Sequence, residues 1–330
     1  MSVAPFDVVG VGNAIVDVTV ETSEAELKRL EINKGTMTLL DIEHADRLYH
    51  EINSGLQCSG GSAANTLAGL ASLGGAGAYI GKVRDDDLGD VFRYDLKAIG
   101  VEYPMRPAGD GLPTARCLVF VTPDADRTML TFLGISATLG PDDIDPETIG
   151  GSQITYLEGY LYDEPEAKEA FFKAAEIAHA AGRKVALTLS DPFCVDRHRA
   201  SFQHLLEAHV DIIFANHDEI TSLCECAALN DAIGMLAGKV EIAALTRGER
   251  GAVIVTSDNV CEIPAERVDK VIDTTGAGDL FAAGVLFGLT RGFDVSKAGR
   301  IGAICAAEVV SHYGARPEAT LAHLIKENPG

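Results

Sequence analysis

The sequence predicts a mixed α/β protein in which helices cover both faces of a mostly parallel sheet, with a small second β-sheet beside it. From about residue 150 onward, β-rich runs alternate with helical stretches, an order typical of parallel sheets. Before that point, two amphipathic strands follow each other without a long helix between them. The 330 residues are enough to bury a large core.

The elements follow from local patterns. Runs rich in β-branched and aromatic residues, bounded by turn residues, predict strands at 6–12, 36–40, 78–83, 115–122, 127–132, 153–158, 184–189, 210–216, 241–246 and 251–256. Apolar residues at helical spacing, often ending at glycine, predict helices at 62–74, 164–182, 197–209, 280–289 and 294–314.

The small sheet is predicted around residues 101–132. Strands 115–122 and 127–132 flank the turn "PDAD" and form a hairpin, and the β-prone runs 17–20 and 36–40 are expected to join it. Such a sheet can serve as a lid. We therefore expect two domains, which are a large α/β domain over 1–16, 42–100 and 134–330 and a lid over 17–41 and 101–133.

Composition excludes several function classes. The formal charge is 27 − 49 = −22, which repels nucleic acid and anionic membranes. No apolar run approaches the ~20 residues that cross a bilayer, and the first residues lack a signal-peptide pattern, so we expect a cytoplasmic protein. Seven scattered cysteines indicate free thiols, and Cys224 and Cys226 lie too close together for a standard zinc pair.

The commonest phosphate-binding motifs are absent. The chain has neither G-x-x-x-x-G-K-[ST] nor a kinase-type H-R-D loop. "GVGNAIVD" imitates a dinucleotide fingerprint at Gly10 and Gly12, but Ile15 stands where close helix–strand packing needs a third glycine. A Rossmann cofactor is therefore disfavoured.

The stretch "VIDTTGAGDL" pairs a candidate anion hole with a carboxylate. Gly276, Ala277 and Gly278 leave backbone N–H groups bare before the helix, whose positive end suits a phosphoryl group. Asp279 could accept the proton of an attacking hydroxyl on the opposite side of that group. The residue types alone equally allow Asp279 to be a helix-capping carboxylate beside a glycine turn.

"DTTGAGDLFAAGVLFGL" resembles the C-terminal signature of the ribokinase-like (PfkB) family of carbohydrate and nucleoside kinases, and further stretches extend the resemblance over essentially the whole chain. It implies a ribokinase-like fold, ATP with Mg²⁺, Asp279 as the base, and an anion hole at 276–278. Some members are stimulated by potassium, and Asp273 and Thr275 occupy the matching neighbourhood.

Two stretches resemble the family's substrate-binding segments. In "GNAIVD", the resemblance implies that Asp17, and more weakly Asn13, hold substrate hydroxyls, although a solvent-facing strand also explains Asp17. "CSGGSAANTLAGLASLG" is similar to G-G-x-x-x-N, which makes Gly60, Gly61 and Asn65 substrate contacts. Ser62 is expected to cap the following helix, and a glycine turn before a core helix is the alternative.

Two later stretches resemble nucleotide-binding segments. Asn216 and Glu219 match N-x-x-E, associated with magnesium and phosphate, and Glu219 would act on Mg²⁺ through water. A plain helix cap is the alternative. "LTRGERGAVIV" is similar to T-x-G-x-x-G, so ATP contacts are expected at Thr246, Arg247, Gly248 and Gly251. An ordinary hairpin turn would also explain this segment.

The sequence defines the molecule that accepts the phosphate less closely than it defines the reaction. "GNAIVD", "NKGTMTLLD" and "EGYLYD" look most like adenosine kinases and their bacterial relatives, which favours adenosine and purine salvage slightly over ribose, fructose or 2-keto-3-deoxygluconate. A purine would want apolar walls, for which the candidates are Met37, Phe120, Phe132 and Tyr160. A sensor that binds a nucleoside or sugar without turnover is the competing class. We expect a monomer or homodimer.

Overall fold

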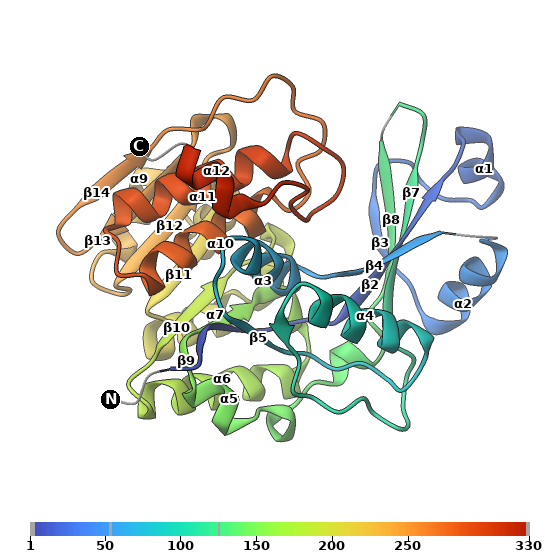
Figure 1. Ribbon diagram of the computed structural model, residues 1–330, viewed down its shortest axis with the longest axis horizontal. Helices are drawn as coiled ribbons and strands as arrows, with labels where there is room; N and C mark the ends of the chain where they lie inside the picture. Colours follow the sequence, from blue (N-terminus) through green and yellow to red (C-terminus); the bar gives the residue numbers. More distant parts are fainter. Residues whose placement is uncertain (1–3, 53–54, 125, 328–330) are drawn as a thin grey trace.

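The computed structural model describes residues 4–52, 55–124 and 126–327 and contains two β-sheets (Figure 1). The larger sheet has nine strands in the order β14-β13-β12-β11-β10-β9-β1-β5-β6, and the smaller has five in the order β3-β8-β7-β2-β4. The predicted fold class, a ribokinase-like α/β protein with a small second sheet, is confirmed.

The large sheet is parallel except at one edge. β1 pairs in parallel with β5 and β9, and β10, β11 and β12 continue the parallel array, whereas β13 and β14 are antiparallel. Its strands are β1 (Phe6–Val11), β5 (Gly77–Ile80), β6 (Val101–Glu102), β9 (Ser152–Glu158), β10 (Lys184–Thr188), β11 (Ile212–Asn216), β12 (Ile242–Thr246), β13 (Ala252–Thr256) and β14 (Val260–Ile263). The parallel strands are near-continuous apolar runs because both of their faces are buried.

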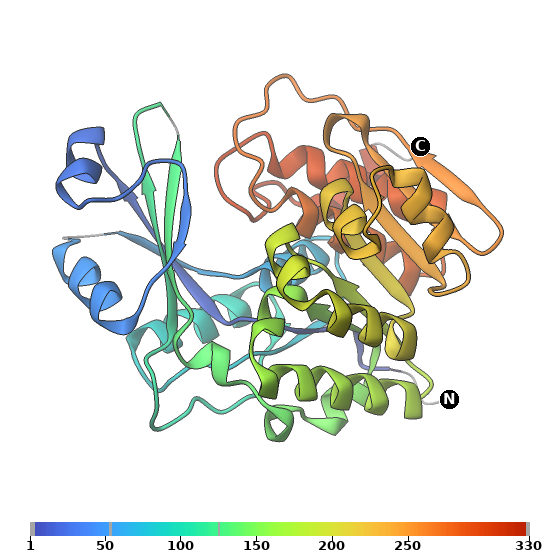
Figure 2. The same cartoon turned by 180° about the vertical axis from the view of Figure 1, so that it is seen from behind.

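Helices cover both faces of this sheet (Figures 1 and 2). Alternate strand residues pack into two apolar clusters. One contains residues of α3 (Ser62–Ser72), α4 (Asp87–Ala98), α10 (Ala277–Thr290), α11 (Val295–Val309) and α12 (Leu321–Glu327). The other contains residues of α5 (Pro146–Gly150), α6 (Pro165–Ala180), α7 (Pro192–His209), α8 (His217–Cys224) and α9 (Leu229–Leu236). Within the described residues, no helix combines the length and apolarity that a membrane span requires.

The small sheet contains the predicted hairpin. β7 (Ala115–Val121) pairs antiparallel with β8 (Arg127–Phe132), and β2 (Ile15–Glu21) lies parallel to β7. β3 (Met37–Leu39) and β4 (Leu56–Gly60) form its edges. In Figure 1, α1 (Glu24–Arg29) and α2 (Ile42–Glu51) lie on the side of this sheet away from α10 and α3. The opposite face therefore looks toward the large domain.

The small sheet departs from the predicted lid boundaries at two strands. β4 lies within the range 42–100 that was expected in the large domain, yet it pairs antiparallel with β2. β6 begins at Val101, inside the expected lid, yet it pairs with β5 in the large sheet. Both strands are short and weakly β-prone, so their sheet is chosen by tertiary pairing, which local propensity does not report. The helices α1, α2, α4, α5, α8, α9 and α12 were also not predicted.

Candidate active site

The turn before α10 adopts the conformation that the glycine pattern requires. Gly276 is the N-cap residue with φ 78°, and a Cβ atom there would lie 2.7 Å from the Cα and O atoms of Ala315. Gly278 is exposed, and a Cβ atom on it would meet nothing within 4 Å. The Ala277 amide already donates to the Thr274 carbonyl at 3.2 Å. The amides of Gly276 and Gly278 are therefore the better candidates for receiving an anion.

Asp279 is held by two donors from α3. Its Oδ1 accepts from Ser62 Oγ at 2.6 Å, and its Oδ2 accepts from Asn65 Nδ2 at 3.2 Å. No ion pair between described residues includes Asp279. The helix N-termini of α3 and α10 are thus joined at the carboxylate, and Ser62 serves this contact while Gly61 takes the N-cap position that was expected of Ser62.

The pKa of Asp279 is tuned by opposing influences. Burial raises it from its usual 3.8 to about 6, while the hydrogen bonds from Ser62 and Asn65 lower it. A carboxylate with a pKa near 6 is largely ionised at neutral pH and is a better proton acceptor than an ordinary aspartate. The arrangement suits a general base.

The acid limb of the pH profile is expected to report this carboxylate. Because the ionised form would be the active one, kcat/KM should fall as the pH drops through about 6. The Ser62→Ala variant loses a hydrogen bond that stabilises the ionised form, so its acid limb should move to higher pH. Initial rates of the two proteins from pH 5 to 9 measure the shift, and identical limbs would contradict it.

Asp17 lies on the face of the small sheet that looks toward the large domain. Its register partners are Cys58 on β4 and Cys117 on β7. Burial raises the pKa of Asp17 to about 6, and the charges of Arg316 and Arg127 lower it. A Cβ atom on Gly60 would lie 2.4 Å from the carboxylate, so a larger residue there would displace the Asp17 side chain.

Asn13 is buried behind this face. It is 1% exposed, its Nδ2 donates to Glu158 Oε1 at 3.1 Å, and its Oδ1 accepts from Ser136 Oγ at 3.0 Å. Gly61, with φ 96°, packs so closely that a Cβ atom would lie 2.5 Å from the Asn13 carbonyl oxygen. In this structure, Asn13 shapes the loop under the substrate segment, and its predicted contact with substrate stays a prediction.

Glu158 is a site residue that sequence reasoning missed. It is 1% exposed and accepts from the amides of Asn13 at 3.3 Å and Ala63 at 2.8 Å, besides the Asn13 side chain. Burial raises its pKa to about 7, and these hydrogen bonds lower it. It ties the end of β1 to the start of α3. The signals were an acidic residue ending an apolar strand, in "ITYLEG", and its place at the start of the stretch "EGYLYD".

Asn216 and Glu219 form a reciprocal capping box at the start of α8. Asn216 Oδ1 accepts from the Glu219 amide at 2.8 Å, while the Glu219 carboxylate accepts from the amide and the side chain of Asn216. Burial is the main cause that raises the pKa of Glu219 to about 7, and the charges of Asp191, Asp218 and Asp279 add to it. The geometry is that of the helix-cap alternative, with a carboxylate under the electrostatic influence of Asp279.

The T-x-G-x-x-G segment is a turn between antiparallel β12 and β13. Thr246 is paired with Asn216 of the neighbouring strand, so both lie at the same sheet edge. The Arg247 guanidinium forms an ion pair with Glu262 on β14. Gly248 and Gly251 both have positive φ, 60° and 76°. The turn conformation accounts for these glycines, and their contacts with ATP stay predictions.

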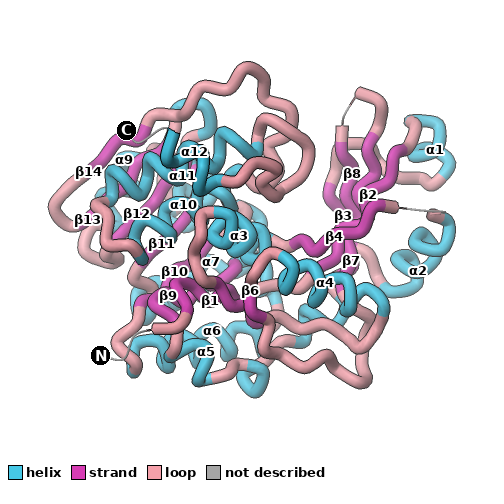
Figure 3. The backbone as a smooth tube through the Cα atoms, viewed as in Figure 1, coloured by secondary structure: helices cyan, strands magenta, loops and turns pink. Residues whose placement is uncertain are grey.

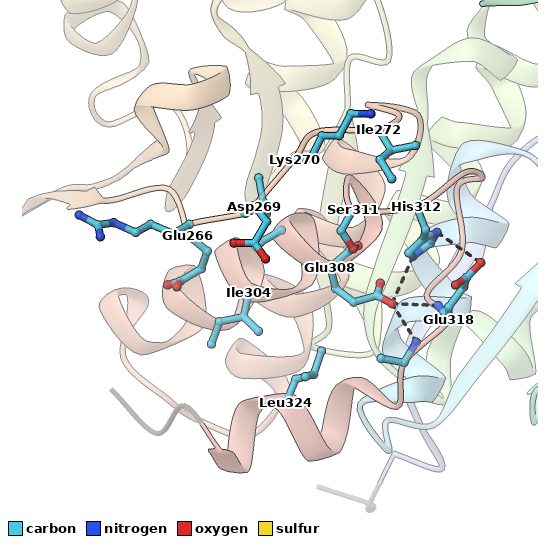
Figure 4. Close-up of a pocket in the computed structure, with 14 residues that line it drawn as sticks. Glu266, Asp269, Lys270, Ile272, Ile304, Glu308, Ser311, His312, Glu318 and Leu324 are labelled. Carbon is cyan, nitrogen blue, oxygen red and sulfur yellow. Dashed lines mark hydrogen bonds and ion pairs between the residues drawn. The ribbon is translucent and has the colours of Figure 1, made fainter. Parts of the chain in front are cut away.

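A cavity of about 760 Å³ lies beside the anion-hole turn (Figure 4). It opens between the irregular segment after β14, drawn as loop in Figure 3, and the last turns of α11. Its lining residues include Glu266, Lys270, Ile272, Ile304, Glu308 and His312. None of the predicted ATP contacts at 216, 246–248 and 251 lines it. Sequence patterns missed it because its lining comes from three separate segments, 266–272, 304–312 and 318–324.

The Asp273 carboxylate joins the anion-hole turn to both neighbouring segments. It accepts from Thr275 Oγ1 at 2.7 Å and from the Gly314 amide at 2.9 Å, and it pairs with Arg127 of β8 at 3.0 Å. Burial would raise the pKa of Asp273, but these partners outweigh it and hold the pKa below its usual value. A strand of the small sheet therefore contacts the turn directly.

A partly buried carboxylate beside amides at a helix N-terminus is an arrangement that suits a phosphotransferase with an alcohol acceptor. The pfkB family carbohydrate kinase model matches residues 37–321. The chain belongs to this family.

Individual relatives agree with this assignment. The chain is similar to the adenosine kinase from Sinorhizobium meliloti (43% identity, TM-score 0.90, 98% of this chain and 100% of that one). It is similar to the "probable sugar kinase protein" from Rhizobium etli CFN 42 (44%, TM-score 0.91, 99% of each chain). The ATP-dependent ribose-1-phosphate kinase from Halopiger xanaduensis is 31% identical over 82% of this chain and 86% of that relative.

Proposed function

We propose that this protein transfers the γ-phosphate of ATP to a primary hydroxyl of a nucleoside, with adenosine favoured over other nucleosides and over free sugars. The observation that carries the reaction is the partly buried Asp279, held by Ser62 and Asn65 at the positive end of α10. The observation that favours a nucleoside is the character of the small sheet's inner face.

The transfer proceeds by in-line displacement. Asp279 accepts the proton of the acceptor hydroxyl, whose oxygen forms the new bond to the γ-phosphorus while the bond to the β-phosphate oxygen breaks. The products are the phosphorylated acceptor and ADP. The amides of Gly276 and Gly278 stabilise the charge on the moving phosphoryl group, and the positive end of α10 adds to this effect.

ATP fits the cavity beside the anion-hole turn. The cavity has the volume of a cofactor site, and Ile272 and Ile304 supply apolar surface for the base. Ile272, the residue before Asp273, lines the cavity, so a nucleotide bound there would direct its phosphates toward the start of α10. Glu266, one of the lining residues, forms an ion pair with Arg300. Asn216, Thr246 and the 247–251 turn would then contact only the nucleotide's periphery.

Magnesium would enter with the nucleotide and neutralise charge on its phosphates. Glu219 suits a bound ion through water, because its oxygens keep lone pairs beyond those used by Asn216. No group of three or more metal-ligating side chains occurs within residues 4–52, 55–124 and 126–327, which agrees with an ion held largely by phosphates. Because the side chains of Asp273 and Thr275 bond each other, a potassium ion there would need backbone carbonyls.

The inner face of the small sheet is apolar apart from Asp17, Glu21, Arg127 and hydroxyl groups. Side chains alternate along each strand, and the register places Met37 beside Met129 and both on the face of Asp17. Met37 is 50% exposed, Leu39 is 54% exposed and Leu56 is 74% exposed. This apolar surface is therefore accessible to a ligand. A flat purine covers such a surface better than a free sugar does.

The same alternation removes two of the predicted purine walls. Phe120 and Phe132 lie on the opposite face from Cys117, which pairs with Asp17. Phe132 instead packs under the guanidinium of Arg116, 5.4 Å from the ring centroid. Met37 keeps its predicted role on the inner face. Tyr160 is 38% exposed and lies near charged Asp191 and Asp279, so it belongs to the reaction end of the site.

A coupled ADP-release assay tests the proposal. Adenosine should give the highest kcat/KM in a panel that contains other nucleosides, ribose, fructose and 2-keto-3-deoxygluconate. A free sugar that gives a higher kcat/KM than every nucleoside would establish the sugar-kinase alternative. The similarity to the Rhizobium etli protein supports that alternative. A thermal-shift response to nucleosides without turnover of any acceptor would establish a sensor.

A further inference from the structure

Arg316 is fixed at the edge of the acceptor site by its own backbone. It lies in the loop between α11 and α12, where the Gly314 amide donates to Asp273 at 2.9 Å. The next residue, Ala315, packs against Gly276 so tightly that a Cβ atom on the glycine would lie 2.7 Å from it. The position of Arg316 is therefore set by the anion-hole turn itself.

Not every N–H group of the Arg316 guanidinium has a hydrogen-bond partner. Its Nε donates to Asn65 Oδ1 at 3.4 Å, and Asn65 in turn donates to Asp279. Its Nη2 is buried and has no partner among the described residues. A buried donor without an acceptor costs free energy, and burial accordingly lowers the pKa of Arg316. A substrate atom that accepts a hydrogen bond from Nη2 is the simplest explanation for an arginine at this position.

The Arg316 guanidinium interacts electrostatically with the Asp17 carboxylate. The guanidinium lowers the pKa of Asp17 and of its neighbour Cys58, yet no ion pair joins Arg316 to Asp17 in the described structure. The Asp17 carboxylate itself accepts no hydrogen bond from a described residue. The charge of Arg316 therefore acts on Asp17, while Arg316 Nη2 and the Asp17 carboxylate each have no hydrogen-bond partner among the described residues.

We propose that Arg316 is a substrate-binding residue whose Nη2 donates to the oxygen of a sugar hydroxyl while Asp17 accepts the proton of that same hydroxyl. This inference rests on the proposed acceptor site. One hydroxyl is both a donor and an acceptor, so it satisfies both charged groups at once. An acceptor that lacks it leaves the buried guanidinium nitrogen without an acceptor and the Asp17 carboxylate without a donor, which is a strong basis for rejection.

The test combines the Arg316→Met variant with deoxy acceptors. Wild-type protein should prefer adenosine over its 2′-deoxy or its 3′-deoxy analogue by about 100-fold or more in kcat/KM. Arg316→Met should lose about 10- to 100-fold on adenosine, mainly through KM, and much less on the disfavoured analogue, so the preference shrinks. Arg316→Lys, which keeps the charge, should recover part of it. Arg199→Met on α7 is the control and should leave all values unchanged.

Two outcomes would overturn the inference. If Arg316→Met lowers kcat equally for adenosine and both analogues with KM unchanged, Arg316 acts only through Asn65 as a positioning residue. If all preferences stay at their wild-type values, Arg316 does not contact the hydroxyl. Should wild type phosphorylate nothing in the panel, the proposed reaction fails, and calorimetric affinities of the same proteins for adenosine and its analogues still decide the role of Arg316.

Discussion

Replacement of Asp279 by asparagine is expected to lower kcat by about 10²- to 10⁴-fold with little change in ATP binding. The amide keeps the size of the carboxylate and one oxygen for Ser62 or Asn65, so the packing of α3 on α10 should survive. It cannot accept the acceptor's proton at neutral pH. Steady-state rates together with nucleotide affinity by calorimetry separate loss of chemistry from loss of binding.

Asp294→Asn provides a matched control for this variant. Asp294 is the N-cap residue of α11, the helix that packs on α10, and its side chain accepts from the Lys297 amide at 2.9 Å. Because asparagine caps helices as well as aspartate, this exchange removes a similar charge near a helix start without touching the site. A near-normal kcat for Asp279→Asn, or an equal loss in both variants, would refute Asp279 as the base.

Replacement of Glu158 by alanine is expected to lower the free energy of unfolding by about 3–5 kcal/mol. The change leaves the amides of Asn13 and Ala63 and the Asn13 side chain buried without their acceptor. It also leaves a cavity next to Gly12. In the wild-type structure, a Cβ atom on Gly12 would lie only 2.4 Å from Glu158 Oε2. Urea unfolding followed by circular dichroism measures the loss.

Glu158→Gln distinguishes lost hydrogen bonds from lost charge. Its carbonyl oxygen can still accept from Asn13, so it should be less destabilised than the alanine variant. The folded-state pKa of Glu158 is raised from 4.5 to about 7, so the folded protein holds this proton more tightly than the unfolded chain does. The stability contributed by that proton is lost as the pH rises from 4.5 through 7. Wild type should therefore lose more stability than Glu158→Gln over this range, and parallel curves would contradict the pKa shift.

Local patterns predicted the elements that carry strong local signals. The hairpin 115–132 and the helices around residues 62–74, 164–182 and 280–289 appear where periodicity and turn residues placed them. The strand β4 and the helices α1 and α4 were missed. β4 has no β-branched or aromatic residue, and α1 has six residues, too few for a periodic signal. β4 takes its place in the small sheet through its pairing with β2.

The candidate site also contains residues that the sequence predicted and residues that only the fold brings together. The motif around Asp279 was readable because a glycine turn, a helix start and a carboxylate are adjacent in the chain. Its partners Ser62 and Asn65 lie more than two hundred residues away, and only folding brings α3 to α10. The role of Glu158 and the nucleotide-sized cavity were likewise invisible, since each depends on groups from separate segments.

The sequence by itself determined the fold class, the phosphotransfer motif and the strongly acidic character, because these follow from periodicity, adjacent residues and composition. Only the tertiary structure decided which face of the small sheet carries Asp17, which donors tune Asp279, and that the charge of Arg316 acts on Asp17. The physical reason is that hydrogen bonding and desolvation act over a few ångströms in space, whatever the separation along the chain.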